Sequence, residues 1–358
     1  MLGYDRTVQD LWNETSAALR PVRCAFCHSM LFRGVAEKIE IKCPKCGTVQ
    51  VVQRNGESLI KERDLSRKGL RRISDMQNRI VTDSVGRLVT IPSQPKRVVI
   101  LNSSNIGLYV ETGGEPVGRG TGEILPEALR DKIKHIPTVG HPYNPDLDSI
   151  LAMKPDLVIG MAFGAHQSLA AVLERKGIPT MLQTFTRYAD VLDALHLYGE
   201  LNAKPDLATQ KIAAIEQHRQ ALIEQTTGQP SPRVLIVWAT ADSLYAALST
   251  SFIGDMVKRL GGVNVADLLT PTDEKAAYAP LNYKGILAAQ PDVILVIDHR
   301  FGEAANHGFQ LMHDSLWQGF QAVRQNCVYT LPFSLFAVNP GAQIEDAMDI
   351  LARFLYKR

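Results

Sequence analysis

The chain has 358 residues, of which 45% are hydrophobic and 21% charged, and its formal net charge is +2. This is the composition of a globular protein, long enough for a small module followed by one large or two medium domains. No stretch approaches the roughly eighteen consecutive apolar residues that cross a bilayer, so we expect no transmembrane segment. The basic charge is concentrated in residues 1–80, which carry fifteen Lys and Arg against nine Asp and Glu.

The start of the chain does not have the pattern of a secretion signal. Such a signal has a positive segment, then about seven to fifteen apolar residues and a small-residue cleavage site, and residues 1–24 contain none of these. Arg71 and Arg72 form a pair typical of a twin-arginine signal, but ISDMQNRIV follows them instead of an apolar run. We therefore expect a cytoplasmic protein.

Two CxxC pairs follow, Cys24 with Cys27 and Cys43 with Cys46, with fifteen residues between the inner cysteines. This spacing is typical of a zinc site, because each pair directs two thiolates at one ion and a hairpin brings the two pairs together. The run IEIK before the second pair is an expected strand. Two disulfides are the alternative, but they need an oxidising compartment. The sequence predicts a zinc ribbon over residues 1–53 with one structural zinc ion.

Residues 54–79 have eight basic and four acidic side chains and few apolar ones. This composition predicts a charged linker or a solvated helix between the ribbon and the rest of the chain.

An internal repeat with an offset of 136 residues organises the remainder. Three matches in one register indicate two lobes built on the same plan. The repeated pairs are residues 96–101 with 232–237, 107–109 with 243–245, and 150–159 with 286–295.

Each lobe alternates short apolar, β-branched runs with longer helical patterns, which is typical of a parallel sheet covered by helices. The fold class predicted is α/β, with two Rossmann-like parallel-sheet lobes, residues 80–204 and 229–358. Residues 205–228 have apolar side chains at helical spacing and are expected to form one long helix that bridges the lobes. The expected strands are RVVIL, PDLVIG and IPTMLQ in the first lobe, and RVLIVW, DVILVI and CVYTL in the second.

Ligands of open parallel sheets bind beyond the carboxyl ends of the strands. Aromatic and polar residues at those positions are typical of a site for a partly apolar small molecule. His166 and His299 could instead cap helices or lie in the core. Tyr109 and Tyr245, at equivalent repeat positions, could also be packing residues. No motif for a nucleophile elbow, a phosphate loop or a zinc protease occurs, so an enzyme is not the favoured interpretation. The candidate ligand-binding residues are Asn102, Ser103, Ser104, His166, Trp238, Tyr245, His299 and Arg300.

From about residue 80 onward, the segments VGHPYNPDLDSILAMKPDLVIG, SFIGDMVKRLGGVNVAD and DSLWQGFQAVRQNCVYTLP resemble the ABC-importer substrate-binding proteins of the iron-siderophore, haem and cobalamin class. The resemblance implies a metal chelate held between two lobes with little hinge motion. It also implies docking on a membrane permease through one acidic residue on each lobe. The first position falls at Asp148, near Asp146, whereas the second holds Lys284 instead of an acid, unless Asp273 or Glu274 substitutes for it.

Residues 20–52 resemble the Com zinc-finger protein of Mu-like phages, a small translational activator that binds messenger RNA. The segments that carry the resemblance are RCAFCHSMLFRG and IEIKCPKCG. It implies the four cysteines as zinc ligands and RNA or DNA as a partner. A solvated ribbon face is the alternative for the candidate phosphate contacts, which are Arg23, Arg33, Lys42 and Lys45.

Three functions follow from these observations. The first is a substrate-binding protein for a metal chelate, of ABC-uptake type but retained in the cytoplasm. The second is a ligand-responsive regulator that binds nucleic acid through the ribbon. The third is a cofactor-handling enzyme, because a two-lobed cleft can also hold a reactive chelate.

Overall fold

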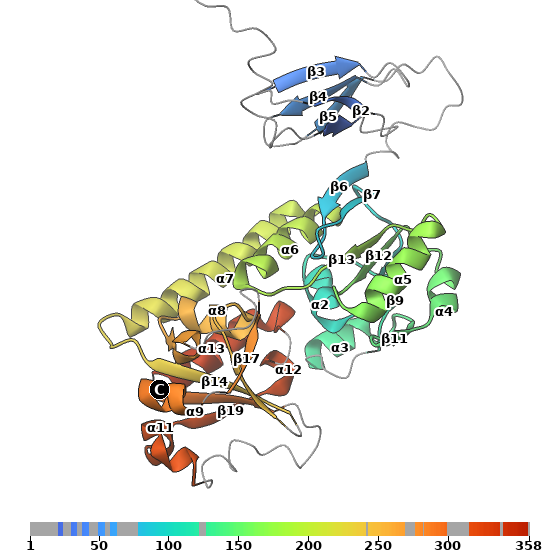
Figure 1. Cartoon of the computed structure of the whole chain (residues 1–358). Coiled ribbons are helices and arrows are strands. Elements are labelled where there is room, and N and C mark those ends of the chain that lie inside the picture. Colours follow the sequence, from blue (N-terminus) through green and yellow to red (C-terminus); the bar gives the residue numbers. More distant parts are fainter. Residues whose placement is uncertain are drawn as a thin grey trace, which may run out of the picture. The chain divides into compact units, whose positions relative to one another are not determined.

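The computed structural model divides the chain into two compact units, residues 1–76 and 77–358, which are described separately below. In the first unit only the backbone of five strands is described (Figure 1). In the second unit the structure describes residues 78–121, 127–240, 243–268, 276–281, 283–298, 315–336 and 339–356.

The first unit contains an antiparallel pair and a three-stranded antiparallel sheet. Strands β1 (Pro21–Arg23) and β2 (Met30–Arg33) form the pair, and β3 (Lys38–Lys42), β4 (Val49–Gln53) and β5 (Ser58–Glu62) form the sheet. The expected strand IEIK is β3. Strand β5 lies inside residues 54–79, so this segment is not a linker throughout. The four cysteines and Lys45 lie outside the described residues, as do the side chains of Arg23, Arg33 and Lys42.

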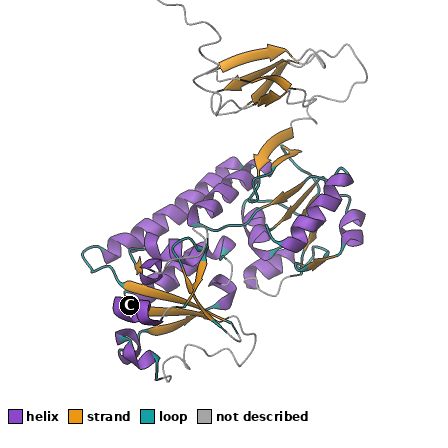
Figure 2. Ribbon diagram, in the orientation of Figure 1, coloured by secondary structure: helices purple, strands orange, loops and turns teal. Residues whose placement is uncertain are grey.

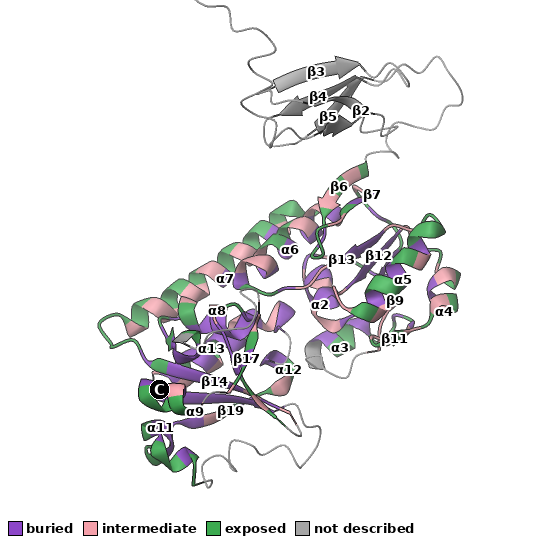
Figure 3. Cartoon of the chain, viewed as in Figure 1, coloured by how far each residue is buried: buried purple, intermediate pink, exposed green. Residues whose placement is uncertain are grey.

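The first lobe is built on a parallel sheet of order β13-β12-β8-β9. Its central strands are apolar and buried, because helices cover both faces of a parallel sheet, as Figures 2 and 3 show. A hairpin, β6 (Asn78–Thr82) with β7 (Leu88–Pro92), precedes this sheet. The strands are β8 (Val98–Ile100), β9 (Gly118–Arg119), β12 (Leu157–Gly160) and β13 (Thr180–Leu182), and the helices are α2 (Ser103–Glu111), α3 (Glu127–Ile133), α4 (Leu147–Ala152), α5 (Gly164–Arg175) and α6 (Tyr188–Leu201).

One long helix, α7 (Pro205–Thr226), leads from the first lobe to the second (Figure 1). Its 22 residues extend over about 33 Å at about 1.5 Å per residue. Pro205 stands in its first turn, where a missing backbone N–H breaks no helical hydrogen bond. The bridging helix predicted from the sequence is therefore present.

The second lobe has a mixed sheet of order β17-β15-β14-β18-β19, with β16 (Val263–Asn264) beside β14. The three expected strands, β14 (Arg233–Ala239), β18 (Val293–Asp298) and β19 (Val328–Leu331), are parallel. Strands β15 (Leu244–Ala247) and β17 (Tyr278–Pro280) add an antiparallel edge that the sequence did not predict. The helices are α8 (Phe252–Arg259), α9 (Tyr283–Ala289), α11 (Gln321–Arg324), α12 (Phe333–Phe336) and α13 (Ile344–Leu355), with 3-10 turns at Val265–Leu268, Trp317–Gly319 and Gly341–Gln343.

The 136-residue repeat correctly predicts equivalent core strands in the two lobes, but it also matches Tyr109 with Tyr245, which are not equivalent. Residues 98 and 157 begin β8 and β12, and their counterparts 234 and 293 lie at the starts of β14 and β18. Tyr109, however, is a buried residue of helix α2, whereas Tyr245 is a partly exposed residue of strand β15. The two tyrosines are therefore not equivalent.

The two lobes share one buried apolar cluster and also touch through polar and backbone contacts. The backbone N–H of Tyr188, at the start of α6, donates to Asp255 Oδ2 of α8 at 2.8 Å. Gly341, which follows β19 and α12, lies so close to α2 that an added Cβ would stand 3.1 Å from the Ser104 carbonyl oxygen. Within the described part of the chain, no helix is long and apolar enough to cross a membrane.

Candidate functional site

Asn102, Ser103 and Ser104 lie where β8 passes into α2, at the carboxyl edge of the first sheet. Asn102 is 5% exposed, and its Oδ1 accepts from Asn105 Nδ2 at 2.7 Å. Asn105 is itself fixed by the Tyr198 hydroxyl, which donates to Asn105 Oδ1 at 2.6 Å. Asn102 thus belongs to a buried polar cluster, whereas the half-buried Ser103 and Ser104 form the first turn of a helix, where N–H groups have no partner within the helix itself.

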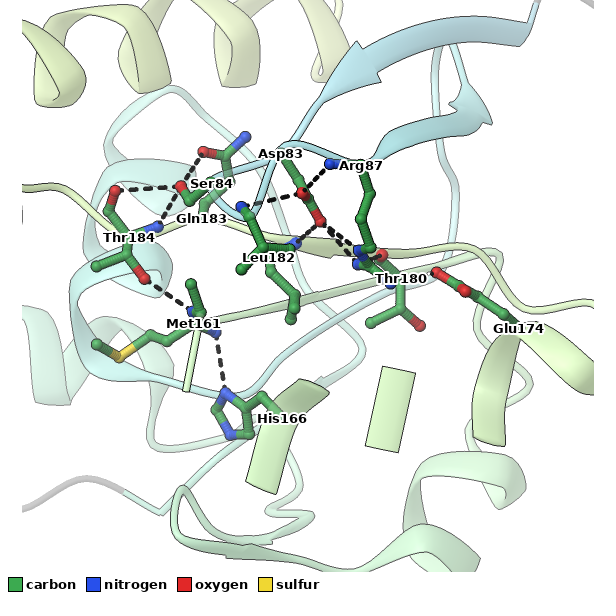
Figure 4. Close-up of polar contacts among 12 residues, drawn as sticks. Asp83, Ser84, Arg87, Met161, His166, Glu174, Thr180, Leu182, Gln183 and Thr184 are labelled. Atoms are coloured by element: carbon green, nitrogen blue, oxygen red, sulfur yellow. Dashed lines mark hydrogen bonds and ion pairs between the residues drawn. The ribbon is translucent and has the colours of Figure 1, made fainter. Parts of the chain in front are cut away.

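His166 lies below the surface at the start of α5. Its side chain has no exposed area, and its Nδ1 accepts from the Met161 N–H at 2.9 Å (Figure 4). Burial lowers the pKa of His166 to about 4, an effect that the backbone of Pro142 only partly offsets. At neutral pH the ring is therefore neutral with its proton on Nε2, which has no hydrogen-bond partner of good geometry among the described residues. His166 holds the backbone of the loop after β12.

The same loop is fixed from its other side by the β6–β7 hairpin. The Ala162 N–H donates to Thr184 Oγ1 at 2.8 Å, and the Thr184 N–H donates to Ser84 Oγ at 2.9 Å. The turn that carries Ser84 is held by the buried carboxylate of Asp83, which accepts from the Arg87 guanidinium at 2.7 and 2.9 Å (Figure 4). The loop is thus preorganised by hydrogen bonds from both sides.

An exposed aromatic group stands beside this loop. A short hairpin, β10 (Gly140–His141) with β11 (Asn144–Pro145), carries Tyr143 at its tip, and Tyr143 is 72% exposed. The rings of His141 and Tyr143 are stacked with centroids 5.4 Å apart, and Phe163 meets Tyr143 edge-on at 5.4 Å. Phe163 in turn contacts His166 at 4.3 Å. The sequence analysis did not select His141 and Tyr143, because a two-residue hairpin tip carries no periodic signal.

The second lobe contributes an aromatic sheet face near the carboxyl end of β14. Trp238 pairs with Tyr245 across β14 and β15, so both side chains lie on one face. Tyr278 of β17 joins them, with its ring 5.3 Å from that of Trp238. Tyr245 and Tyr278 are 36% and 37% exposed. The structure thus brings two predicted residues together and adds Tyr278, whereas His299 and Arg300 lie outside the described residues.

The candidate docking residues lie on equivalent helices of the two lobes. Asp148 is in the first turn of α4, and Asp146 caps that helix by accepting from the Asp148 N–H at 3.1 Å. Lys284, 136 residues later, is in the first turn of α9. The side chains of Asp148 and Lys284 are both exposed. Asp273 and Glu274 lie outside the described residues.

Two α/β lobes joined by one long helix, with aromatic and polar side chains at the strand ends, define a two-lobed binding protein. The family model described as periplasmic binding protein matches residues 98–335, and the chain belongs to this family. Residues 18–68 match the model described as Mu-like prophage protein Com, a zinc-ribbon family. Both resemblances found in the sequence are therefore confirmed, as is the fold class.

Individual relatives agree with this assignment. The high-affinity heme uptake system protein IsdE of Staphylococcus aureus is 27% identical over 244 residues, which are 64% of this chain and 78% of that protein. The crystal structure of S. aureus IsdE complexed with heme has a TM-score of 0.61 at 22% identity, covering 73% of this chain and 98% of IsdE. The catecholate-siderophore binding protein VctP of Vibrio cholerae has a TM-score of 0.64 at 16% identity, covering 77% and 99%.

Proposed function

We propose that this chain binds an iron chelate of haem type at the carboxyl edges of its two sheets, as the substrate-binding component of an ABC-type uptake system. One observation carries the choice of haem: an exposed tyrosine, Tyr143, is packed between the rings of His141 and Phe163. Tyrosine and histidine both ligate haem iron in proteins. The relatives named above as heme and siderophore binders support the same substrate class.

Of the two possible iron ligands, the hydrogen bonding favours Tyr143. The Tyr143 N–H donates to His141 Nδ1 at 3.2 Å, so the neutral imidazole carries its proton on Nε2. Coordination through Nε2 would require that proton to leave and the hydrogen bond to Nδ1 to break. The hydroxyl of Tyr143 must also lose its proton to bind iron, but that step leaves the hydrogen bond from the Tyr143 N–H to His141 Nδ1 intact. We therefore assign Tyr143 as the iron ligand and His141 as the residue that orients it.

Trp238, Tyr245 and Tyr278 supply a second aromatic surface. Flat aromatic side chains bury large apolar area with few freely rotating bonds, which suits a planar macrocycle better than a flexible polar chelate. In this proposal the chelate contacts this face in the second lobe and Tyr143 in the first. The relatives that the chain resembles are solute-binding proteins, which favours binding without chemical conversion.

A panel of chelates tests this proposal. Haemin, a ferric catecholate siderophore and cobalamin are titrated separately while tryptophan fluorescence and visible absorption are recorded, with Trp238→Phe as the control for the source of the fluorescence signal. We expect one equivalent of haemin to bind and to quench the fluorescence. Tight binding of the siderophore or cobalamin with no binding of haemin would overturn the choice of haem.

For the ribbon we propose one zinc ion held by Cys24, Cys27, Cys43 and Cys46, with nucleic acid as its partner. The spacing of the cysteine pairs supports the zinc site, and the match to Com supports both statements. Four reduced thiolates favour a cytoplasmic location, whereas delivery of a chelate to an importer requires the outer face of the membrane, so the location decides between the two parts of the proposal. Metal analysis should give one zinc per chain and none in a Cys24→Ser/Cys27→Ser variant. Binding to RNA should weaken with salt and vanish in that variant. Cell fractionation tests whether the protein lies in the cytoplasm.

Permease docking through Asp148 is the remaining part of the proposal. The exposed Lys284 in the equivalent position gives the second lobe a positive charge there. An Asp148→Lys variant should lose binding to permease vesicles, whereas Lys284→Glu should strengthen it, because complementary charges steer association. Equal binding by both variants would contradict this assignment.

A further inference from the structure

Two buried side-chain amides, one in each lobe, have a nitrogen without a hydrogen-bond partner among the residues that the structure describes. Asn102 is 5% exposed and Asn339 is 6% exposed, and in both the unpartnered atom is Nδ2. A buried donor without a partner is costly, so natural proteins keep few of them, and each calls for a reason. The fold itself does not supply one for these two nitrogens.

The neighbours of both amides fix which end is oxygen and which is nitrogen. Asn105 Nδ2 donates to the Gln183 carbonyl oxygen at 3.0 Å and to Asn102 Oδ1 at 2.7 Å. In the second lobe, the Gly341 N–H donates to Asn339 Oδ1 at 3.2 Å. Exchanging oxygen and nitrogen in either amide would break these bonds, because an NH₂ group cannot accept. The unpartnered atoms of Asn102 and Asn339 are therefore both donors.

Both amides stand at the beginning of helix α2. Asn102 is the N-cap residue of α2, yet its side chain makes no capping bond to the first turn. The N–H groups of that turn have no partner within the helix, and they give the helix N-terminus a partial positive charge. An added Cβ on Gly341 would lie 3.3 Å from Ser104 Cα, so Asn339, which is hydrogen-bonded to Gly341, stands beside the same turn. The unpartnered donors of the two lobes thus lie at one junction.

The donors at this junction are neutral, and this decides the kind of ligand that fits. Asp298, the buried acid that ends β18 in the second sheet, accepts from neither amide. A phosphate carries more charge than neutral donors usually balance, and proteins commonly add arginine or lysine to bind it. A carboxylate carries a single charge, and its two oxygens can accept from two separate amides. The donor set therefore suits a carboxylate.

We propose that the junction of Asn102, Asn339 and the first turn of α2 is a binding site for a carboxylate group. The two Nδ2 atoms donate to its oxygens, and the backbone N–H groups of the turn supply further donors. The carboxylate is an arm of the chelate, in which case this inference rests on the proposed function, or a separate small carboxylate. Because each lobe contributes a donor, the bound group also ties the lobes together.

Haemin, which carries free carboxylates, and its dimethyl ester, which carries none, test the first source in absorption titrations of the full chain. The unsubstituted protein should bind haemin about tenfold more tightly than the ester, since hydrogen bonds to a charged group are lost with the ester. Asn102→Asp and Asn339→Asp keep the acceptor oxygen of each amide and remove only the donor. Each should weaken haemin binding about tenfold and leave the affinity for the ester unchanged. Asn326→Asp, at an exposed turn before β19, is the matched control and should alter neither affinity.

Succinate, titrated into the chelate-free protein, tests the second source through the nuclear magnetic resonance signals of the asparagine side-chain amides. Shifts of the Asn102 and Asn339 signals, together with equal affinities for haemin and its ester, would assign the site to a separate carboxylate. If neither haemin nor the ester binds, the proposed function fails, and the succinate titration alone decides on the carboxylate site. Equal affinities for haemin and its ester in all variants, with no succinate-dependent shift of either amide signal, would overturn the inference.

Discussion

The buried histidine of the first lobe predicts a specific loss of stability in mild acid. The pKa of His166 is about 4 in the folded protein, against an ordinary value of 6.5, chiefly because of burial. Between these two pH values the unfolded chain binds a proton that the folded protein does not bind. The free energy of unfolding therefore falls as the pH falls, with a limiting slope of about 1.4 kcal/mol per pH unit.

Integrated from pH 7.5 to 4.5, this linkage amounts to about 2.5 kcal/mol from His166 alone. Carboxylates with lowered pKa values, such as Asp190 and Glu216, lose their contribution only below their ordinary range, so they add little above pH 4.5. The measurement is urea unfolding of the full chain at several pH values in this window. The stabilising effect of a neutral His166 should be complete above about pH 7.5, one unit above its ordinary pKa.

A His166→Asn variant identifies the source of the slope. Asparagine keeps an acceptor for the Met161 N–H but does not titrate. The variant should be less stable at pH 7.5, because the ring volume is lost, yet its stability should change by about 2.5 kcal/mol less across the window. His135→Asn removes an exposed histidine and should behave like the unsubstituted protein. The same pH slope in His166→Asn and the unsubstituted protein would refute the reasoning.

Three further predictions concern packing and binding. Asp83→Asn should lower the free energy of unfolding by about 2 kcal/mol, because a fully buried carboxylate loses its charged bonds to Arg87. Its control is Asp131→Asn, in an exposed ion pair, which should cost less than about 1 kcal/mol in the same urea assay. Gly114→Ala should cost about 1 to 3 kcal/mol through overlap with Tyr109, whereas Gly164→Ala, with open space around it, should be neutral or slightly stabilising by thermal unfolding. Trp238→Ala should weaken haemin binding about tenfold in absorption titrations, and unchanged affinity would remove the second lobe from the site.

The sequence predicted the parts of the fold that depend on burial. Strands β8, β12, β14 and β18 are continuous apolar runs because helices cover both sheet faces, and such runs are visible without a structure. The tripeptide match of residues 107–109 with 243–245 failed for the opposite reason. Three residues do not determine whether a segment is helix or strand, and the surrounding lobe decided it.

The candidate site was predicted less completely than the fold. Trp238 and Tyr245 were selected because they follow or neighbour a predicted strand; the structure places both on one sheet face, and their role in binding stays a prediction. His166 was selected by the same rule, yet the chain turns its ring inward beneath Phe163, a packing detail that strand ends do not reveal. Tyr143 was missed because its importance comes from exposure and from its neighbours His141 and Phe163, which only the folded chain brings together.

The most direct test of the proposed function is a haemin titration of the unsubstituted protein and of Tyr143→Phe, followed by visible absorption. The unsubstituted protein should bind one haemin with bands characteristic of an iron–phenolate bond. In Tyr143→Phe these bands should be absent and the affinity lower by at least about tenfold, a loss that even supporting residues of metal sites produce. Tyr109→Phe, at the opposite edge of the sheet, should match the unsubstituted protein. Wild-type bands and affinity in Tyr143→Phe, or no haemin binding by the unsubstituted protein, would contradict the account.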